Sequence, residues 1–127
     1  MKLESIATDL APKAVAAYSQ AIRAGGFLFL SGQIPLDPAS GQMVSGDVAA
    51  QTRRVMDNLR GVLQGAGSSL EQVVKVTIYL VEMDDFAVVN QTYAEYFPGD
   101  PKPARVTVAV KALPRGAAVE IDMIAVA

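Results

Sequence analysis

Apolar side chains recur along this chain with two different periods, and each period predicts one kind of element. Between residues 48 and 63, mostly apolar positions return every three or four residues, as on one face of an α-helix: Val48, Thr52, Val55, Met56, Leu59, Val62 and Leu63. Asp47 can cap the start of this helix. Gly65-Ala66-Gly67 can end it, because glycine tolerates the left-handed cap conformation. The pattern therefore predicts a first helix that begins after Asp47.

Alternation of apolar and polar positions predicts strands. From Val73 to Val81, one face carries Val74, Val76, Ile78 and Leu80, and the other carries Lys75, Thr77, Tyr79 and Val81. Further strands are predicted at Leu3–Ala7, Ala17–Ala24, Phe27–Ser31, Pro103–Val110 and Val119–Val126. Gly25-Gly26 separates two of these strands and predicts a hairpin turn.

A second helix is expected after Asp84 or Asp85, either of which can cap it, with Phe86, Val89, Tyr93 and Phe97 facing inward and Pro98–Pro101 ending it. Turns are expected at Pro35–Gly41 and Pro114–Gly116. The order of elements is then ββ(β)-α-β-α-β-β. Strand-helix-strand units imply parallel pairs with right-handed crossovers, so both helices should cover the same face of the sheet.

The other face of the sheet is expected to carry Lys75, Thr77, Arg105 and Thr107. Such a face combines charged, polar and apolar side chains, so it is too polar to belong to a buried core and too apolar to be fully exposed to water. We therefore expect sheets to pack together in an oligomer. The overall hydrophobic content of 51% is high for a small soluble domain and favours the same conclusion.

Composition narrows the chemistry that this chain can perform. The 127 residues, taken as one domain (residues 1–127), contain no His, Cys or Trp. Thiol nucleophiles, Ser-His triads, imidazole bases and nearly all His/Cys metal sites are excluded, so neither a metal nor another cofactor is expected. The formal charge of −2 disfavours a general nucleic-acid binder. No signal peptide or membrane-length apolar run is present, so a cytoplasmic location is expected.

Arg105 is the most informative single residue, because its guanidinium stands at the start of an otherwise apolar strand. Two interpretations are open: an ion pair with a protein carboxylate, or bidentate capture of a small carboxylate ligand. Glu120 also has two interpretations, an exposed strand position or a partly buried carboxyl that holds a water. If the last two strands paired as a hairpin, Arg105 and Glu120 would fall at its opposite ends. They would then meet only across a subunit boundary or through a different strand order.

Three further positions have both a structural and a functional interpretation. Ser31-Gly32 ends a strand, either as a simple turn or as a place where backbone amides approach a ligand. Tyr18 either packs at the rim of the core or forms one wall of a pocket. Asn90, one turn after Phe86 on the second predicted helix, either caps or cross-links backbone or reaches a ligand cleft.

Taken in order, several short stretches resemble the Rid/YjgF family of reactive intermediate (enamine/imine) deaminases. They cover nearly the whole chain: Ala11-Pro12, Tyr18–Ala21, Ser31–Pro35, Gln51-Thr52, Asn58-Leu59, Asp85-Phe86, Val89-Asn90, Tyr93, Pro103–Arg105, Glu120-Ile121 and Ala125-Val126. The resemblance implies a chorismate-mutase-like α/β fold, assembled as a homotrimer with clefts between subunits. It also implies a 2-iminobutanoate/2-iminopropanoate deaminase, which hydrolyses 2-aminoacrylate and related 2-imino acids to 2-keto acids and ammonia.

The resemblance also implies roles for individual residues. Arg105 matches the residue that grips the substrate carboxylate, and Glu120 matches the one that positions the attacking water. Backbone groups near Gly32 and Thr107 complete the pocket, and Ser31, Tyr18 and Asn90 match lining or supporting positions. Two positions depart from the family pattern. Thr107 stands where many members have Cys, and Ala16-Ala17 replaces the usual Gly-Pro before the tyrosine.

Three other functions remain alternatives to a deaminase. The first is a regulatory trimer that binds a carboxylate ligand without turnover. The second is the ribonuclease or translation-inhibitor role attributed to some relatives, which the acidic balance and missing His disfavour. The third is a holdase-type chaperone, suggested by the apolar surplus. Retention of both Arg105 and Glu120 favours the enzyme over the regulatory trimer.

Overall fold

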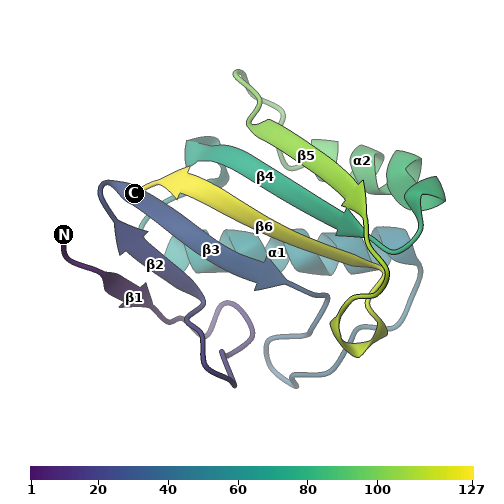
Figure 1. Cartoon of the computed structure of the whole chain (residues 1–127), viewed down its shortest axis with the longest axis horizontal. Helices are drawn as coiled ribbons and strands as arrows, with labels where there is room; N and C mark the ends of the chain where they lie inside the picture. Colours follow the sequence, from purple (N-terminus) through teal and green to yellow (C-terminus); the bar gives the residue numbers. More distant parts are fainter.

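The computed structural model describes residues 1–127. Its strands form one six-stranded mixed sheet in the order β1-β2-β3-β6-β4-β5 (Figure 1). They are β1 (Glu4–Ile6), β2 (Ala21–Ala24), β3 (Phe27–Gln33), β4 (Val73–Leu80), β5 (Ala104–Ala109) and β6 (Val119–Val126). The helices are α1 (Val48–Gly65) and α2 (Phe86–Ala94), and short 3-10 turns lie at Leu70–Gln72, Met83–Asp85 and Pro114–Gly116.

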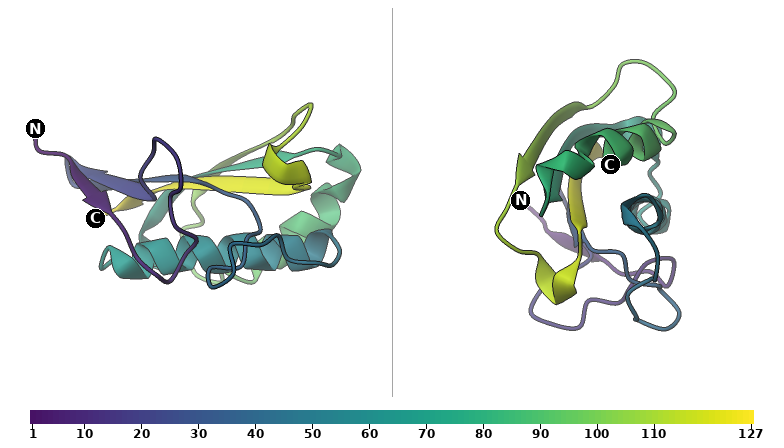
Figure 2. Two further views of the ribbon diagram at one scale, coloured as in Figure 1. Left: turned by 90° about the horizontal axis from the view of Figure 1, so that it is seen from below. Right: turned by 90° about the vertical axis from the view of Figure 1, so that its right-hand side faces the viewer.

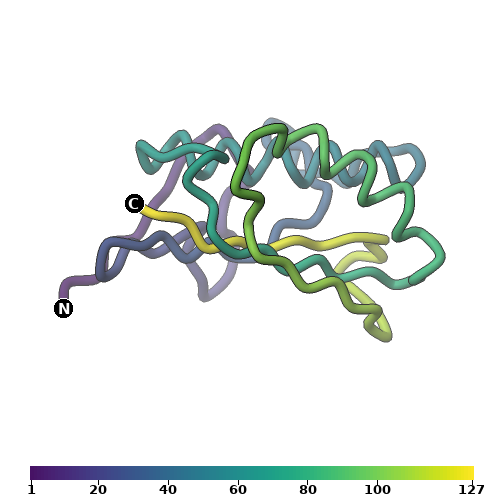
Figure 3. The backbone as a smooth tube through the Cα atoms, turned by 90° about the horizontal axis from the view of Figure 1, so that it is seen from above, coloured from purple at the N-terminus to yellow at the C-terminus, as the bar shows by residue number.

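Both helices lie on one side of the sheet, as the sequence predicts, and the connection between β5 and β6 projects from the other side (Figures 2 and 3). α2 joins β4 to β5, which run parallel. The predicted order of elements is confirmed. The sheet therefore has one face covered by helices and one face that nothing in the chain covers, which we call the open face.

The core lies between the helices and the covered face. α1 buries Val55, Met56, Leu59, Val62 and Leu63 against Leu28, Val76, Ile78, Ile121 and Met123 of the sheet, all at most 1% exposed. Burial of each large side chain contributes about 1.5–3 kcal/mol. The predicted cap is confirmed, because Asp47 Oδ1 accepts the Ala50 N–H at 3.0 Å. Neither helix has the length and apolar character needed to cross a membrane.

The Gly25-Gly26 hairpin is also confirmed. Both glycines have positive φ, +58° and +82°, a backbone conformation that favours glycine. The turn pairs Ala24 with Phe27 and sets the antiparallel register of β2 and β3.

The strand predicted at Ala17–Ala24 begins only at Ala21. The reason is Gln20, whose side chain is 3% exposed and binds backbone groups of the preceding loop. Its Oε1 accepts the Thr8 N–H at 2.7 Å, and its Nε2 donates to the carbonyls of Thr8 and Pro12 at 3.0 and 2.8 Å. Residues 17–20 are thus anchored as a loop, which places Tyr18 at the surface with 51% exposure.

Three smaller expectations are also corrected. Val74 was predicted to face inward, but a bulge between Val73 and Lys75 leaves it 41% exposed. The first strand is shorter than Leu3–Ala7, since β1 covers Glu4–Ile6. Asp85 precedes α2, but its side chain makes no capping hydrogen bond, because the turn at Met83–Asp85 already leads into the helix.

The largest correction concerns the faces of β5. Arg105 and Thr107 were expected on the open face beside Lys75 and Thr77. The parallel register instead pairs Arg105 with Val76 and Thr107 with Ile78, two residues of the covered face. β5 and β6 also form no hairpin, because β4 lies between them. Arg105 therefore lies on the side of α2, whereas the open face carries Glu120 and Asp122 in register with Tyr79 and Thr77.

Candidate active site

One cluster of predicted residues surrounds Arg105. Its Nη1 donates to Asn90 Oδ1 at 2.6 Å, and its guanidinium carbon lies 5.0 Å from the ring centre of Tyr93 and 5.5 Å from that of Phe86. The three α2 residues are spaced four and three positions apart, so they share one helix face. We call Phe86, Asn90 and Tyr93 the Arg105 cradle. Asn90 thus orients a side chain instead of capping backbone.

The Arg105 guanidinium has no carboxylate partner within the chain. The four ion pairs join Arg23 to Glu4, Arg53 to Glu95, Arg60 to Asp57 and Lys102 to Asp100. Arg105 is exposed, and the cradle supplies one amide oxygen and two ring faces. Burial raises the pKa of Tyr93, and the neighbouring Arg105 opposes that shift. An oriented guanidinium with free N–H donors is a suitable receptor for a carboxylate.

Thr107 lies two residues farther along the free edge of β5. Its hydroxyl oxygen is buried and has no hydrogen-bond partner, so this side chain offers a ligand nothing from its present position. The Val110 N–H binds the Leu80 carbonyl. By the alternation of a parallel pair, the N–H and C=O of Thr107 point away from β4. Any contact from this position is therefore made by the backbone, which the exchange of Cys for Thr leaves intact.

A second cluster lies around Glu120 at the start of β6. β3 contains a bulge between Leu30 and Gln33, and Gly32 lies within it. The Glu120 carboxylate crosses directly over Gly32: a Cβ on Gly32 would lie 3.0 Å from Glu120 Cδ and still closer to Oε2. Ser31 ties the neighbouring loop to β3, because its Oγ donates to the Ser19 carbonyl at 2.6 Å. The Tyr18 loop, Ser31, Gly32 and Glu120 thus form one group.

Partial burial raises the pKa of Glu120 above its ordinary value, and the negative charge of Asp122 adds to the shift. A carboxyl whose pKa is raised is a stronger base than an ordinary carboxylate and can both accept and return a proton. The Glu120 cluster therefore offers acid-base chemistry, whereas the Arg105 cradle offers anion binding.

Substitution of Gly32 by alanine is expected to move the Glu120 carboxylate without unfolding the protein. The atom in the way is the end of a flexible side chain, so the cost in stability should stay within about 1 kcal/mol. If Glu120 takes part in catalysis, the rate of substrate turnover should fall while the midpoint of thermal unfolding hardly changes. Gly99→Ala, where a Cβ meets nothing within 4 Å, is the matched control. Full activity in Gly32→Ala would contradict a role for the present Glu120 geometry.

The two clusters do not meet within one chain. Arg105 is on the covered side of β5 and Glu120 is on the open side of β6, with β4 between the two strands. The sequence left two ways for Arg105 and Glu120 to meet, a different strand order or contact between subunits. The observed strand order does not bring the two residues together. Contact across a subunit boundary is the route that remains.

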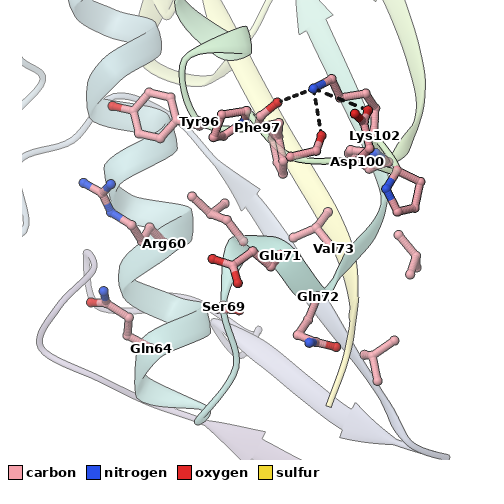
Figure 4. Close-up of a pocket in the computed structure, with 17 residues that line it drawn as sticks. Arg60, Gln64, Ser69, Glu71, Gln72, Val73, Tyr96, Phe97, Asp100 and Lys102 are labelled. Carbon is pink, nitrogen blue, oxygen red and sulfur yellow. Dashed lines mark hydrogen bonds and ion pairs between the residues drawn. The ribbon is translucent and has the colours of Figure 1, made fainter.

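Two cavities lie near the Arg105 cluster. The smaller, about 380 Å³, is lined by Asn90, Tyr93, Arg105 and four neighbours from residues 94–103. The larger, about 900 Å³, lies between α1, the start of β4 and the 96–103 turn (Figure 4). None of the predicted site residues lines the larger cavity. Its cations Arg60 and Lys102 are already bound to Asp57 and to backbone carbonyls. The smaller cavity is the better candidate, because it contains the unpaired cation.

No group of three or more Asp and Glu side chains is arranged to hold a metal ion. Sequence reasoning missed the aromatic part of the cradle as site residues. The signal was present in the spacing of Phe86, Asn90 and Tyr93, but the two rings were assigned to the core alone. It also missed Tyr79, because nothing in the sequence indicates which strand borders β6, and it gave Asp122 no role although alternation puts it on the same face as Glu120.

Comparison with known proteins finds relatives that match nearly the whole chain. The family model described as "Endoribonuclease L-PSP" matches residues 8–127. A RutC family protein of Pyrococcus horikoshii is 54% identical over 122 residues, 96% of each chain. The 2-iminobutanoate/2-iminopropanoate deaminase of Mus musculus is 46% identical over 121 residues, 95% of this chain and 89% of the mouse protein. A solved Rid family protein of unknown function from Yersinia pestis has a TM-score of 0.97 and 45% identity, covering 99% of this chain and 100% of that one.

Proposed function

Because this chain belongs to the endoribonuclease L-PSP family, which is the YjgF/Rid family, we propose that it is a 2-imino acid deaminase. It hydrolyses 2-aminoacrylate, 2-iminopropanoate and 2-iminobutanoate to 2-keto acids and ammonia. The observation that carries the proposal is the Arg105 guanidinium, which Asn90 orients at 2.6 Å and which no carboxylate of the chain neutralises. The name of the mouse relative supports the choice of substrate.

Arg105 binds the substrate carboxylate and so sets the position of the imine carbon. A planar guanidinium makes two parallel hydrogen bonds to a carboxylate, which defines the orientation as well as the location of the substrate. The N–H of Thr107, on the same free edge, contributes a further hydrogen-bond donor. Anchoring and orientation account for most of the expected acceleration, because a held imine is already reactive toward water.

Glu120 binds the attacking water over Gly32 and takes one of its protons as the C–O bond forms. The π electrons of the C=N bond move to nitrogen, which takes a proton from a solvent water to give a carbinolamine. Glu120 then returns its proton to nitrogen, the C–N bond breaks with release of ammonia, and the hydroxyl proton passes back to solvent as the C=O bond forms. The net reaction consumes one imine and one water and yields one 2-keto acid and one ammonia, without a redox step.

We infer that the working assembly is a homotrimer in which Arg105 of one subunit faces Glu120 of the next. The separation of the two clusters within one chain supports this arrangement. The open face supports it as well, because it exposes large apolar side chains that water solvates poorly: Phe27, Phe29, Val106, Val108 and Val126. Light scattering should give about three chain masses, and a stable monomer would contradict a site built between subunits.

The direct test is a coupled assay in which a serine or threonine dehydratase generates the imine in situ. Semicarbazide traps the imine that remains, so a working deaminase lowers the trapped signal in proportion to its concentration. Heat-denatured protein is the control. A folded trimer that leaves the signal unchanged would reject the deaminase and favour a regulatory, carboxylate-binding trimer.

RNA cleavage is the second candidate, because the matching family model is described as an endoribonuclease. The chain has no His to form the general acid-base pair that such cleavage commonly uses. Ribonuclease activity that persists through further purification and falls in Arg105→Ala would favour this candidate. Activity that disappears on purification would reject it.

A further inference from the structure

A pair of acidic side chains and one tyrosine lie together on the open face beside Gly32. Glu120 and Asp122 alternate with buried residues along β6, so both point to the open side. Tyr79 of β4 lies in register with Glu120, but its hydroxyl donates diagonally to Asp122 Oδ2 at 3.0 Å. The phenol therefore holds the Asp122 carboxylate beside Glu120.

No cation of the same chain compensates this pair. Neither Glu120 nor Asp122 belongs to any of the four ion pairs. Lys75 lies on the same face but in register with Ile124, which is farther along β6. On the other side of β6, β3 presents Ser31 and Gly32, which do not titrate near neutral pH. The groups that face Glu120 are therefore Asp122 on its own strand and Tyr79 on β4.

In the proposed reaction, the negative charge of Asp122 would affect proton transfer by Glu120. Glu120 must take a proton from water and keep it until the carbinolamine nitrogen is ready to leave. A lone surface carboxylate is a weak base that holds such a proton poorly. A fixed negative charge nearby makes the protonated form of Glu120 more favourable. In the proposed trimer, the positive charge of Arg105 from the neighbouring subunit favours the ionised form of Glu120 instead. The balance between the two charges therefore sets how readily Glu120 accepts and releases a proton.

We propose that Asp122, held in place by Tyr79, is a positioning residue that adjusts Glu120 to accept and return the proton during imine hydrolysis. This inference rests on the proposed function. Asp122 touches neither the substrate nor the water in this scheme, and it acts only through Glu120.

The test is the pH profile of kcat/KM for imine hydrolysis by wild type and Asp122→Asn, with Glu71→Gln as the control on an exposed acid that belongs to neither cluster. The reaction needs ionised Glu120 to accept the proton, so activity falls on the acidic side of the profile. Removal of the Asp122 charge lowers the pKa of Glu120, and this limb should move to lower pH. The plateau should fall roughly threefold to tenfold, because a weaker base transfers protons less well. Glu71→Gln should match wild type.

Tyr79→Phe provides a second arm, because it keeps the ring and removes the hydrogen bond to Asp122. The acidic limb of the pH profile is expected to move to lower pH in this variant as well, but by less than in Asp122→Asn. Carbon-13 NMR of the Glu120 carboxyl, titrated in each variant, measures protonation without any activity. An unchanged Glu120 titration in folded Asp122→Asn overturns the inference even if the enzyme is active. A shifted titration in a protein without deaminase activity rejects the proposed function alone.

Discussion

Replacement of Arg105 by alanine is expected to lower kcat/KM for 2-imino acids by about a hundredfold or more. Two hydrogen bonds between charged groups are lost, each worth about 1.5–3 kcal/mol. The imine carbon also loses the orientation that these bonds impose. The coupled semicarbazide assay measures the effect on imines. Isothermal titration with 2-oxobutanoate, the stable 2-keto acid product of 2-iminobutanoate hydrolysis, measures binding separately and should show a parallel loss of affinity.

Two controls separate this effect from a general loss of structure. Arg53 is a matched exposed arginine, paired with Glu95 at 3.0 Å on the helix side, so Arg53→Ala should leave kcat/KM within about twofold. Arg105→Lys keeps the charge but cannot form the two parallel bonds, and it should recover only part of the activity. If Arg105→Ala remained fully active while folded, the carboxylate anchor would have to be sought elsewhere.

Glu120→Gln is expected to lower kcat by about a hundredfold to ten-thousandfold while KM changes little. The glutamine can still bind a water but cannot take its proton, and general base catalysis contributes roughly this factor. Binding of the carboxylate by Arg105 is untouched, which is why KM should hold. Steady-state kinetics of the two variants should therefore differ: Arg105→Ala should raise KM as well as lower kcat, whereas Glu120→Gln should lower kcat alone. An equal rise of KM in both would contradict the division of roles.

The same substitution makes a prediction about stability. Burial raises the pKa of Glu120 in the folded protein, so its ionisation is less favourable there than in the unfolded chain. The protonated carboxyl contributes its full stability at pH values below the pKa that Glu120 has in the unfolded chain. This contribution is lost as the pH rises through the higher pKa that Glu120 has in the folded protein. At about pH 7 glutamine avoids this loss. The variant should therefore unfold at the same temperature as wild type or a higher one. A clear destabilisation at neutral pH would indicate that the Glu120 carboxylate makes a favourable contact within the fold.

Local patterns predicted most of the elements. The helical period over residues 48–63 predicted α1 and its cap at Asp47, and alternation predicted β6 over Val119–Val126 as observed. The predicted elements were wrong where a single residue interrupted the expected pattern of side chains. The buried Gln20 amide delayed β2, and the bulge at Val74 broke the alternation of β4. Neither event follows from a periodicity, because each depends on partners distant in the chain.

For the candidate site, the sequence determined the kind of chemistry. A chain without His or Cys must rely on Arg, carboxylates and backbone amides, and the ordered motifs around Arg105 and Glu120 indicated which ones. Only the tertiary structure decided where they lie. The strand order puts β4 between β5 and β6, which separates Arg105 from Glu120, and it puts β6 between β3 and β4, which brings Glu120 beside Gly32 and Tyr79. The physical reason is that side-chain period is a local property, whereas strand order depends on which strands pair across long separations, and that pairing sets which side chains become neighbours.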